Sequence, residues 1–207
     1  FFIDIGAHHY EHDSVSLLFS KLGWIGIHVE PLAQLAQALR ENRPADKVLE
    51  AAVGTKPGMM TLYEVDEGFG ITTGSKELAE QHSSSGFKIK ETQVAQRTLA
   101  DILDNEAPAE VHWLKIDVEG MEHDVIKSWA GSPKRPWIVL LESTEPMKPE
   151  PNHHVWEPDL LALGYRFVYF DGLNRFYISG DHPELERFFN CGPNYFDDFV
   201  VTPGHWV

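Results

Sequence analysis

The amino-acid sequence predicts an α/β protein with a mostly parallel, doubly wound sheet that ends in an antiparallel hairpin. Three apolar runs within residues 1–53 alternate with two segments of helical spacing, the order that produces a parallel sheet with helical crossovers. Two further buried strands are expected at 111–117 and 137–141. Near the C-terminus, two apolar runs flank a turn at 171–174, which indicates a hairpin at the edge of the sheet.

The elements of the first half follow from apolar runs that Gly or Pro closes and from apolar residues at helical spacing. Strands are expected at 1–5, 25–30 and 47–53. Helices are expected at 14–22 and 32–42. Gly6 closes the first strand and Pro31 stops the second, while Asp13 or Ser14 is the expected N-cap of the first helix.

The middle of the chain is less regular. Residues 59–65 resemble an added strand, and residues 66–92 are rich in Gly, Ser, Thr and charged residues. A long stretch without periodicity predicts a lid-like loop, with a short helix at 78–82. A strand that leads into a helix is expected at 94–103, and further helices are expected at 121–129 and 156–163, each after a buried strand. The two strands of the hairpin are expected at 165–170 and 175–178.

All 207 residues are expected to form a single domain, because the length is that of one ordinary domain and no repeat divides it. The chain begins with strand-like residues rather than Met, which leaves open a missing N-terminal segment.

Composition disfavours several classes of partner. The 32 acidic and 17 basic side chains give a net charge of -15, which repels nucleic acid and anionic membrane surfaces. No apolar run approaches the roughly 20 residues that span a bilayer. The single cysteine, Cys191, excludes an intrachain disulfide and fits a reducing compartment, so a cytoplasmic location is expected.

Carboxylates gather at the expected carboxyl ends of the strands, the edge where open parallel sheets bind their ligands. Four of the five strand ends carry one, at Asp4, Glu30, Asp117 with Glu119, and Glu142. One such residue has the simple explanation that a strand is returning to water. Four at one edge predict a shared binding site.

A dinucleotide is the first ligand to consider at this edge. Its pyrophosphate needs the second glycine of G-x-G-x-x-G, but His8 and Glu11 occupy the second and third glycine positions after Gly6. An NAD-dependent oxidoreductase is therefore the less favoured alternative. S-adenosylmethionine (AdoMet) has no phosphate and carries a positive sulfonium and a positive ammonium group, so carboxylates suit it.

The residues at the strand ends can be matched to the parts of AdoMet. Glu30 is placed to accept hydrogen bonds from both ribose hydroxyls. Asp4 can hold the Gly6 turn or reach the ammonium group through water, and Asp117 lies where the sulfonium would be. The small apolar surface at 51–53 suits the adenine.

Metal binding is a further alternative. Asp4, Asp117, Glu119 and Glu142 carry the hard oxygen ligands that Mg²⁺ prefers. No metal site is assigned, but Asp117 and Glu142 are the expected ligands if a cation polarises the substrate. A cluster of His8, His9, His12 and Asp13 offers transition-metal ligands, although solvated or substrate-facing histidines are the simpler interpretation.

Four stretches, at 2–9, 23–31, 51–54 and 114–122, together resemble the FkbM-type methyltransferases in order and spacing. The resemblance covers residues 1–180 and implies a Rossmann-like class I fold that uses AdoMet. It also implies O-methylation, with a sugar, a glycolipid or a glycosylated natural product as the acceptor. Gly6, Glu30, Val53 and Asp117 match the cofactor-binding positions of that family.

The expected site combines these arguments. Candidates for the base that takes the hydroxyl proton are His9, Glu119 and Glu142. The expected cofactor-binding residues are Asp4, Gly6, Ala7, His8, Glu30, Pro31, Ala52, Val53 and Asp117. The partner would be a small-molecule or glycan acceptor, and the oligomeric state is left open. A non-catalytic ligand-binding protein on the same fold is the alternative from another functional class.

Overall fold

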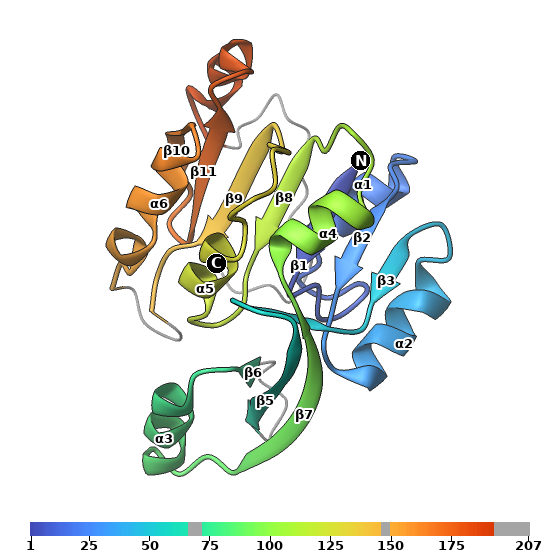
Figure 1. The fold of residues 1–207 in the computed structure, drawn as a ribbon, viewed down its shortest axis with the longest axis vertical. Coiled ribbons are helices and arrows are strands. Elements are labelled where there is room, and N and C mark those ends of the chain that lie inside the picture. Colours follow the sequence, from blue (N-terminus) through green and yellow to red (C-terminus); the bar gives the residue numbers. More distant parts are fainter. Residues whose placement is uncertain (66–71, 146–149, 193–207) are drawn as a thin grey trace.

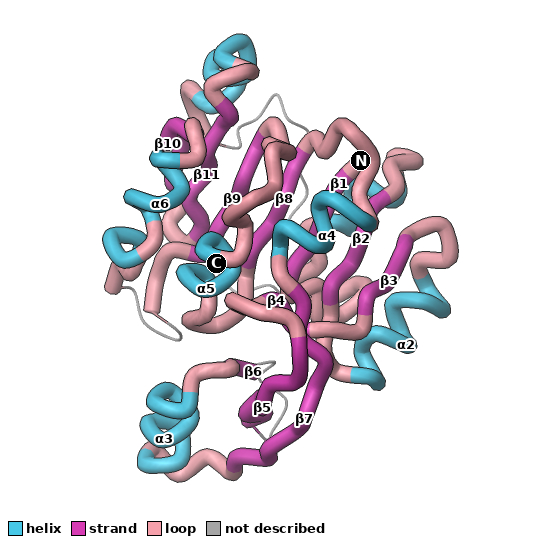
Figure 2. The backbone as a smooth tube through the Cα atoms, viewed as in Figure 1, coloured by secondary structure: helices cyan, strands magenta, loops and turns pink. Residues whose placement is uncertain are grey.

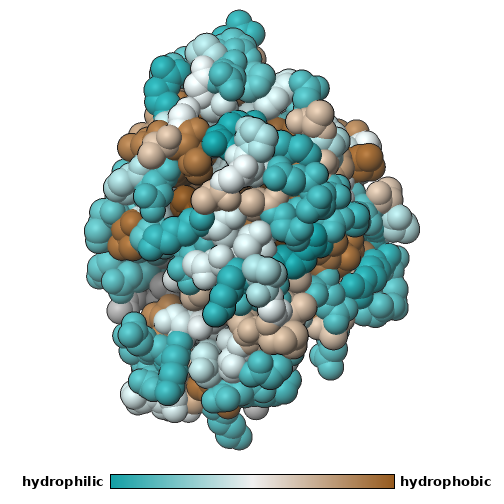
Figure 3. Space-filling model, viewed as in Figure 1, coloured by the Kyte–Doolittle hydropathy of each residue, from teal (hydrophilic) through white to brown (hydrophobic). Residues whose placement is uncertain are grey.

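The computed structural model describes residues 1–65, 72–145 and 150–192 of the chain. Two sheets organise it, a larger one of seven strands and a smaller one of four (Figure 1). Among the described residues, no helix has the length and apolar character needed to cross a membrane. The face in Figure 3 is largely hydrophilic, with small apolar patches between polar side chains.

The larger sheet has the strand order β10-β11-β9-β8-β1-β2-β3. The consecutive strands β9, β8, β1, β2 and β3 run parallel, whereas β11 is antiparallel to β9 and β10 to β11. The strands span Phe2–Ile5 (β1), Gly26–Val29 (β2), Lys47–Leu49 (β3), Trp113–Ile116 (β8), Ile138–Glu142 (β9), Tyr165–Phe170 (β10) and Asn174–Ser179 (β11). This arrangement confirms the predicted fold class, including the C-terminal hairpin.

Helices cover both faces of this sheet. They span Ser16–Lys21 (α1), Ala33–Asn42 (α2), Leu99–Asn105 (α4), Glu122–Lys127 (α5) and Glu157–Ala162 (α6). On one face, Ile3 and Ile5 of β1 join the main core with apolar residues of α4 and α5, which lie in front of the sheet in Figure 1. On the other face, Phe2 stacks on Trp113, whose ring lies 4.8 Å from that of Phe19 in α1.

The start of α1 differs from the prediction. Val15 is the N-cap, and no side chain caps the helix. Ser14 is engaged elsewhere, because its hydroxyl accepts a hydrogen bond from Arg43 and lies 3.3 Å from the hydroxyl of Ser16. Asp13 has a left-handed backbone, with φ of 54°. The side chain of neither expected residue therefore caps the helix, although the Ser14 carbonyl accepts the N–H of Leu17.

The predicted strand at 47–53 is wrong as a single element. β3 ends at Leu49, and the chain leaves the larger sheet through a tight turn in which the Ala51 N–H donates to the Leu49 carbonyl. Ala52–Val53 (β4) then pairs with a strand of the other sheet, where Ala52 faces Gln96. Hydrophobic pattern alone did not reveal this change of sheet, because both halves of the run are apolar.

The smaller sheet has the order β4-β7-β5-β6 and lies beyond the carboxyl ends of β1, β2 and β8 (Figure 2). Its other members are Gly58–Val65 (β5), Thr72–Thr73 (β6) and Ile89–Arg97 (β7). The helix Lys76–Ser84 (α3) connects β6 to β7. The expected strand at 59–65 and the expected strand-to-helix passage at 94–103 are confirmed by β5, β7 and α4.

The segment at 66–92, expected to be lid-like and irregular apart from a short helix, is more regular than expected in its described part. Residues 66–71 lie outside the described part, but β6, α3 and the start of β7 occupy much of the rest. The helix expected at 78–82 is confirmed by α3, which Ser75 caps by accepting the N–H of Leu78. The outer half of β7 has polar residues on both faces, so its sequence lacks the alternation that marks a strand. Two short 3-10 helices, His153–Val155 and Pro183–Phe189, also went unpredicted.

Candidate functional site

A cavity of about 250 Å³ lies between the carboxyl ends of β1, β2 and β8 and the smaller sheet. Every expected cofactor-binding residue except Asp4 lines it, namely Gly6, Ala7, His8, Glu30, Pro31, Ala52, Val53 and Asp117. The strand-end argument therefore brought together residues that lie far apart in the sequence. Their role in binding a cofactor stays a prediction.

The turn at Gly6 lets β1 and β8 approach closely at the cavity. Gly6 has φ of +74°, and a Cβ at this position would lie 1.8 Å from the carbonyl oxygen of Asp117. Its N–H donates to the carbonyl of Val29 in β2. Only glycine combines this left-handed conformation with such a close backbone approach.

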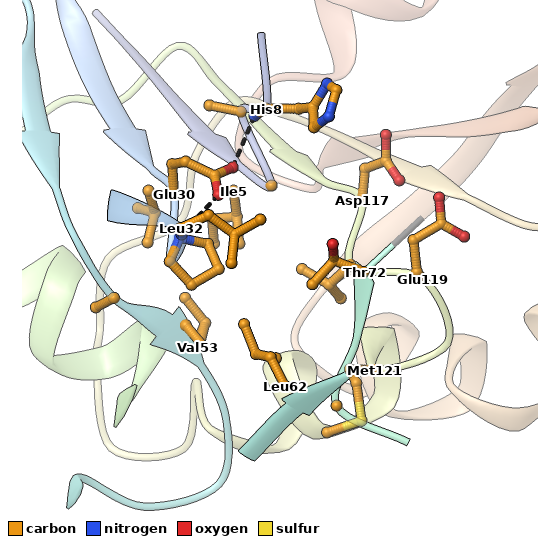
Figure 4. A pocket seen from close by; sticks show the side chains of 18 of the residues that line it. Ile5, His8, Glu30, Leu32, Val53, Leu62, Thr72, Asp117, Glu119 and Met121 are labelled. Carbon is orange, nitrogen blue, oxygen red and sulfur yellow. Dashed lines mark hydrogen bonds between the residues drawn. The ribbon is translucent and has the colours of Figure 1, made fainter. Parts of the chain in front are cut away.

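Glu30 is held rigidly at the end of β2. Its side chain is buried, at 4% exposure, and its carboxylate accepts the N–H of His8 and the N–H of Leu32, both at 2.9 Å (Figure 4). Burial raises the pKa of Glu30 to about 7, although these two backbone hydrogen bonds oppose the rise. The carboxylate is thus fixed in the cavity wall by its own backbone surroundings, with lone pairs left for a ligand.

Lys115 is the cation of the site, and sequence reasoning missed it. Its ammonium lies 2.9 Å from Asp117 and 3.6 Å from Asp4, and it donates to the Gly6 carbonyl at 3.3 Å. Burial disfavours the charged form, but Asp4 and Asp117 outweigh it, so the pKa of Lys115 is raised. The sequence feature that could have identified Lys115 is its position within an otherwise apolar buried strand, because a buried lysine needs an acidic partner.

Asp4 acts behind the cavity rather than in its lining. One carboxylate oxygen accepts a hydrogen bond from Ser16 at 2.7 Å, and the other faces Lys115. Asp4 is thus linked to the Gly6 turn through Lys115, and its two expected roles stay predictions.

Three carboxylates meet at one end of the site. Asp117, Glu119 and Glu142 each place an oxygen within 4.8 Å of the others. Burial, with repulsion from Asp117 and Glu122, raises the pKa of Glu119 to about 7. Burial, repulsion from Asp117 and Glu119, and a hydrogen bond to Asp117 raise the pKa of Glu142 to about 9. Glu142 therefore holds a proton at neutral pH.

This carboxylate group includes the two expected metal ligands, Asp117 and Glu142. Among the described residues it is the group whose geometry could hold a cation, and it contains no histidine. Magnesium binding stays a prediction.

The opposite end of the cavity is apolar. Ala52, Leu62 and Val94 form a small buried cluster there, with Leu32 and Met60 packed against it, and all of these except Val94 line the cavity. Met60 and Leu62 come from β5 and were not predicted as site residues. No local feature of β5 indicates that it folds over the ends of distant strands.

The histidines of the first loop separate into two positions. His8 lines the cavity, and its φ of 50° turns its N–H toward Glu30. His9 is not part of the lining. Its Nδ1 accepts the N–H groups of Glu11 and His12, both at 3.0 Å, and its ring stacks on Tyr10. A role for His9 as the base stays a prediction that this arrangement does not favour.

Comparison with known proteins gives a consistent result. The family model of the methyltransferase FkbM domain matches residues 4–167. The fold is similar to a crystal structure of methyltransferase FkbM from Methylobacillus flagellatus KT, with a TM-score of 0.51 and 14% identity over 86% of this chain. The match spans 42% of that longer chain. No curated protein sequence matches this one.

Proposed function

Because this chain belongs to the FkbM methyltransferase family, we propose that it binds AdoMet in the cavity and transfers the methyl group to a hydroxyl of an acceptor. The two steps, cofactor binding and methyl transfer, use different parts of the site.

The distribution of polarity around the cavity carries this proposal. Leu32, Val53 and Leu62 lie on one side with Glu30 beside them, while Asp117 and Glu119 lie across the cavity (Figure 4). The apolar side would hold the adenine, Glu30 would accept hydrogen bonds from the ribose hydroxyls, and the carboxylates would face the sulfonium. The order of these surfaces follows the order of the chemical groups in AdoMet.

The first loop supports AdoMet over a dinucleotide. A pyrophosphate is normally bound by a helix N-terminus directly after the glycine turn. Here α1 begins only at Ser16, well beyond Gly6. Asp117 would in addition repel a phosphate. An NAD-dependent oxidoreductase is therefore the weaker alternative.

Methyl transfer at this site would be a direct displacement. The acceptor oxygen forms a bond to the methyl carbon as the carbon–sulfur bond breaks, and the electron pair remains on sulfur in S-adenosylhomocysteine. Positioning of the hydroxyl against the sulfonium supplies most of the rate increase. The hydroxyl proton must pass to a base.

Glu119 is the best-placed base of the three candidates. It lines the cavity, and its pKa of about 7 suits proton transfer near neutral pH. The pKa of Glu142 is raised further than that of Glu119, which makes Glu142 the poorer base at that pH, and its hydrogen bond to Asp117 would orient that carboxylate. The acceptor is proposed to be a sugar, a glycolipid or a glycosylated natural product, on the strength of the family resemblance.

Transfer of a labelled methyl group from AdoMet to a panel of sugar and small-hydroxyl acceptors tests the proposal. Glu119→Gln is expected to lower kcat about 100-fold or more, the range for loss of a general base, and to leave the KM for AdoMet nearly unchanged. Glu110→Gln, at an exposed site, serves as the control. AdoMet binding without transfer to any acceptor would favour a non-catalytic binding protein, and full activity of Glu119→Gln would remove the assigned base.

A further inference from the structure

The turn that carries Glu119 has an unfavourable backbone conformation. Glu119 has φ of 50° and Gly120 has φ of 92°, so two successive residues are left-handed. Residues other than glycine rarely adopt this conformation, and it persists where surrounding groups fix it. The neighbours of this turn therefore determine where the Glu119 carboxylate lies.

Glu122 holds the N–H groups of the turn. One oxygen of its buried carboxylate accepts from Val118 at 3.3 Å and from Gly120 at 3.1 Å. This contact comes from the helix that follows the turn, so it is local. This contact does not involve the carbonyl of Glu119, which needs a partner of its own.

Thr73 of β6 supplies that partner. Its hydroxyl donates to the Glu119 carbonyl at 2.7 Å, across a separation of 46 residues. Its side chain is buried, at 1% exposure, and its oxygen accepts the N–H of Ser75 at 3.0 Å. The Ser75 contact occupies a lone pair of the hydroxyl, so the proton is directed at Glu119.

The smaller sheet thereby connects the two ends of the cavity. Thr73 pairs with Tyr63 of β5, the strand that contributes Met60 and Leu62 to the apolar end. The helix α3, which connects two strands of the smaller sheet, also packs closely against the turn at Gly120, where an added Cβ would lie 2.6 Å from the Leu78 side chain.

We infer that Thr73 is a positioning residue. By its hydrogen bond to the Glu119 carbonyl, the Thr73 hydroxyl fixes the turn and so keeps the Glu119 carboxylate among the reacting groups. The same bond connects the turn to the smaller sheet, which would cover the cofactor. The predicted effect on turnover rests on the proposed function, whereas the effect on the turn itself does not. Without the hydroxyl, the partly buried carbonyl of Glu119 loses its partner and the turn can relax away from Asp117 and Glu142.

Thr73→Val tests the inference, because it keeps the shape of the side chain and removes the hydroxyl. Hydrogen exchange of a peptide that covers 118–122 is expected to become about ten-fold faster, since the protected amides of the turn open more often. The expected fall in kcat is about ten-fold or more, within the range that small misplacements cause. The KM for AdoMet should stay within about three-fold, and Thr73→Ser should restore both readouts.

A control variant and a substitute variant accompany this test. Thr61→Val removes a hydroxyl from β5 that contacts Gln93 and not the turn, so it should change neither readout. Thr73→Ala replaces the valine variant if that variant does not fold. Unchanged exchange of the 118–122 peptide in a folded variant without the hydroxyl would overturn the inference. Absence of methyl transfer in the unmodified protein would instead contradict the proposed function, and the exchange result would still decide the role of Thr73.

Discussion

The backbones of Gly6 and Asp117 meet at the site. Gly6 keeps the ends of β1 and β8 in contact, and the Lys115 ammonium binds both the Gly6 carbonyl and the Asp117 carboxylate. A side chain at Gly6 would separate groups that the proposed cofactor must contact together. The site is therefore sensitive to a single methyl group at this position.

Gly6→Ala is expected to lower the free energy of unfolding by about 2 kcal/mol or more, through left-handed strain and a backbone clash. It should also abolish AdoMet binding. Urea unfolding and calorimetry measure the two effects.

Gly23→Ala is the matched control, because Gly23 has a similar φ of +85° but nothing within 4 Å of an added Cβ. It should show the strain alone, with AdoMet binding intact. Equal effects of the two substitutions would refute the importance of the Gly6 contact with Asp117.

The sequence allowed prediction of the site residues that end strands, since the topology of a parallel sheet brings such ends together. Glu30 and Asp117 were found in this way, and both line the cavity. Lys115 and Thr73 were not found. Lys115 lies within a strand and not at its end, so the strand-end argument did not include it. Thr73 contacts Glu119 across 46 residues, and no local sequence pattern connects these two segments.

At the element scale, the smaller sheet distinguishes this molecule from a bare parallel sheet with helices. The predicted strand at 47–53 is divided because β3 is a short edge strand and β4 pairs with β7 instead. The apolar residues of this run predict buried strands, but they do not indicate which of the two sheets each part of the run joins. Partner choice depends on contacts with β7, more than 40 residues later, so it could not be read from the run itself.

Leu62 tests whether β5 forms part of the cofactor site. Leu62→Ala removes most of a buried side chain at the apolar end of the cavity. AdoMet affinity is expected to fall about ten-fold, equivalent to ~1.4 kcal/mol of lost apolar contact. The measurement is calorimetry on folded protein.

Val94→Ala separates binding from stability, because Val94 belongs to the same apolar cluster but does not line the cavity. It should destabilise the protein by about 1–3 kcal/mol and leave the affinity unchanged. If both substitutions weaken AdoMet equally, β5 supports the fold and not the cofactor.

At the scale of the whole molecule, an acidic chain with a net charge of -15 buries several carboxyl groups in its site. The pKa of Glu142 lies near 9 in the folded protein, against an ordinary value of 4.5. Between these two values the folded state binds more protons than the unfolded state. The stabilisation is therefore complete below about pH 4.5 and is lost as the pH rises toward 9.

Glu142→Gln removes this titration and keeps a neutral side chain of the same shape. The variant should lose less stability than the unmodified protein as the pH rises from about 6 to about 9, measured by urea unfolding at each pH. Glu110→Gln, on the surface, should retain the original slope. A slope unchanged by Glu142→Gln would contradict the assigned proton on Glu142.

The central claim, that the cavity is an AdoMet site, is tested most directly by calorimetric titration of AdoMet into the protein and into Glu30→Gln. The unmodified protein should bind one AdoMet per chain and show no heat with NAD. Glu30→Gln should bind about ten- to hundred-fold more weakly, because it loses charge-assisted hydrogen bonds from the ribose. No binding of AdoMet, or an affinity that Glu30→Gln leaves unchanged, would contradict the account.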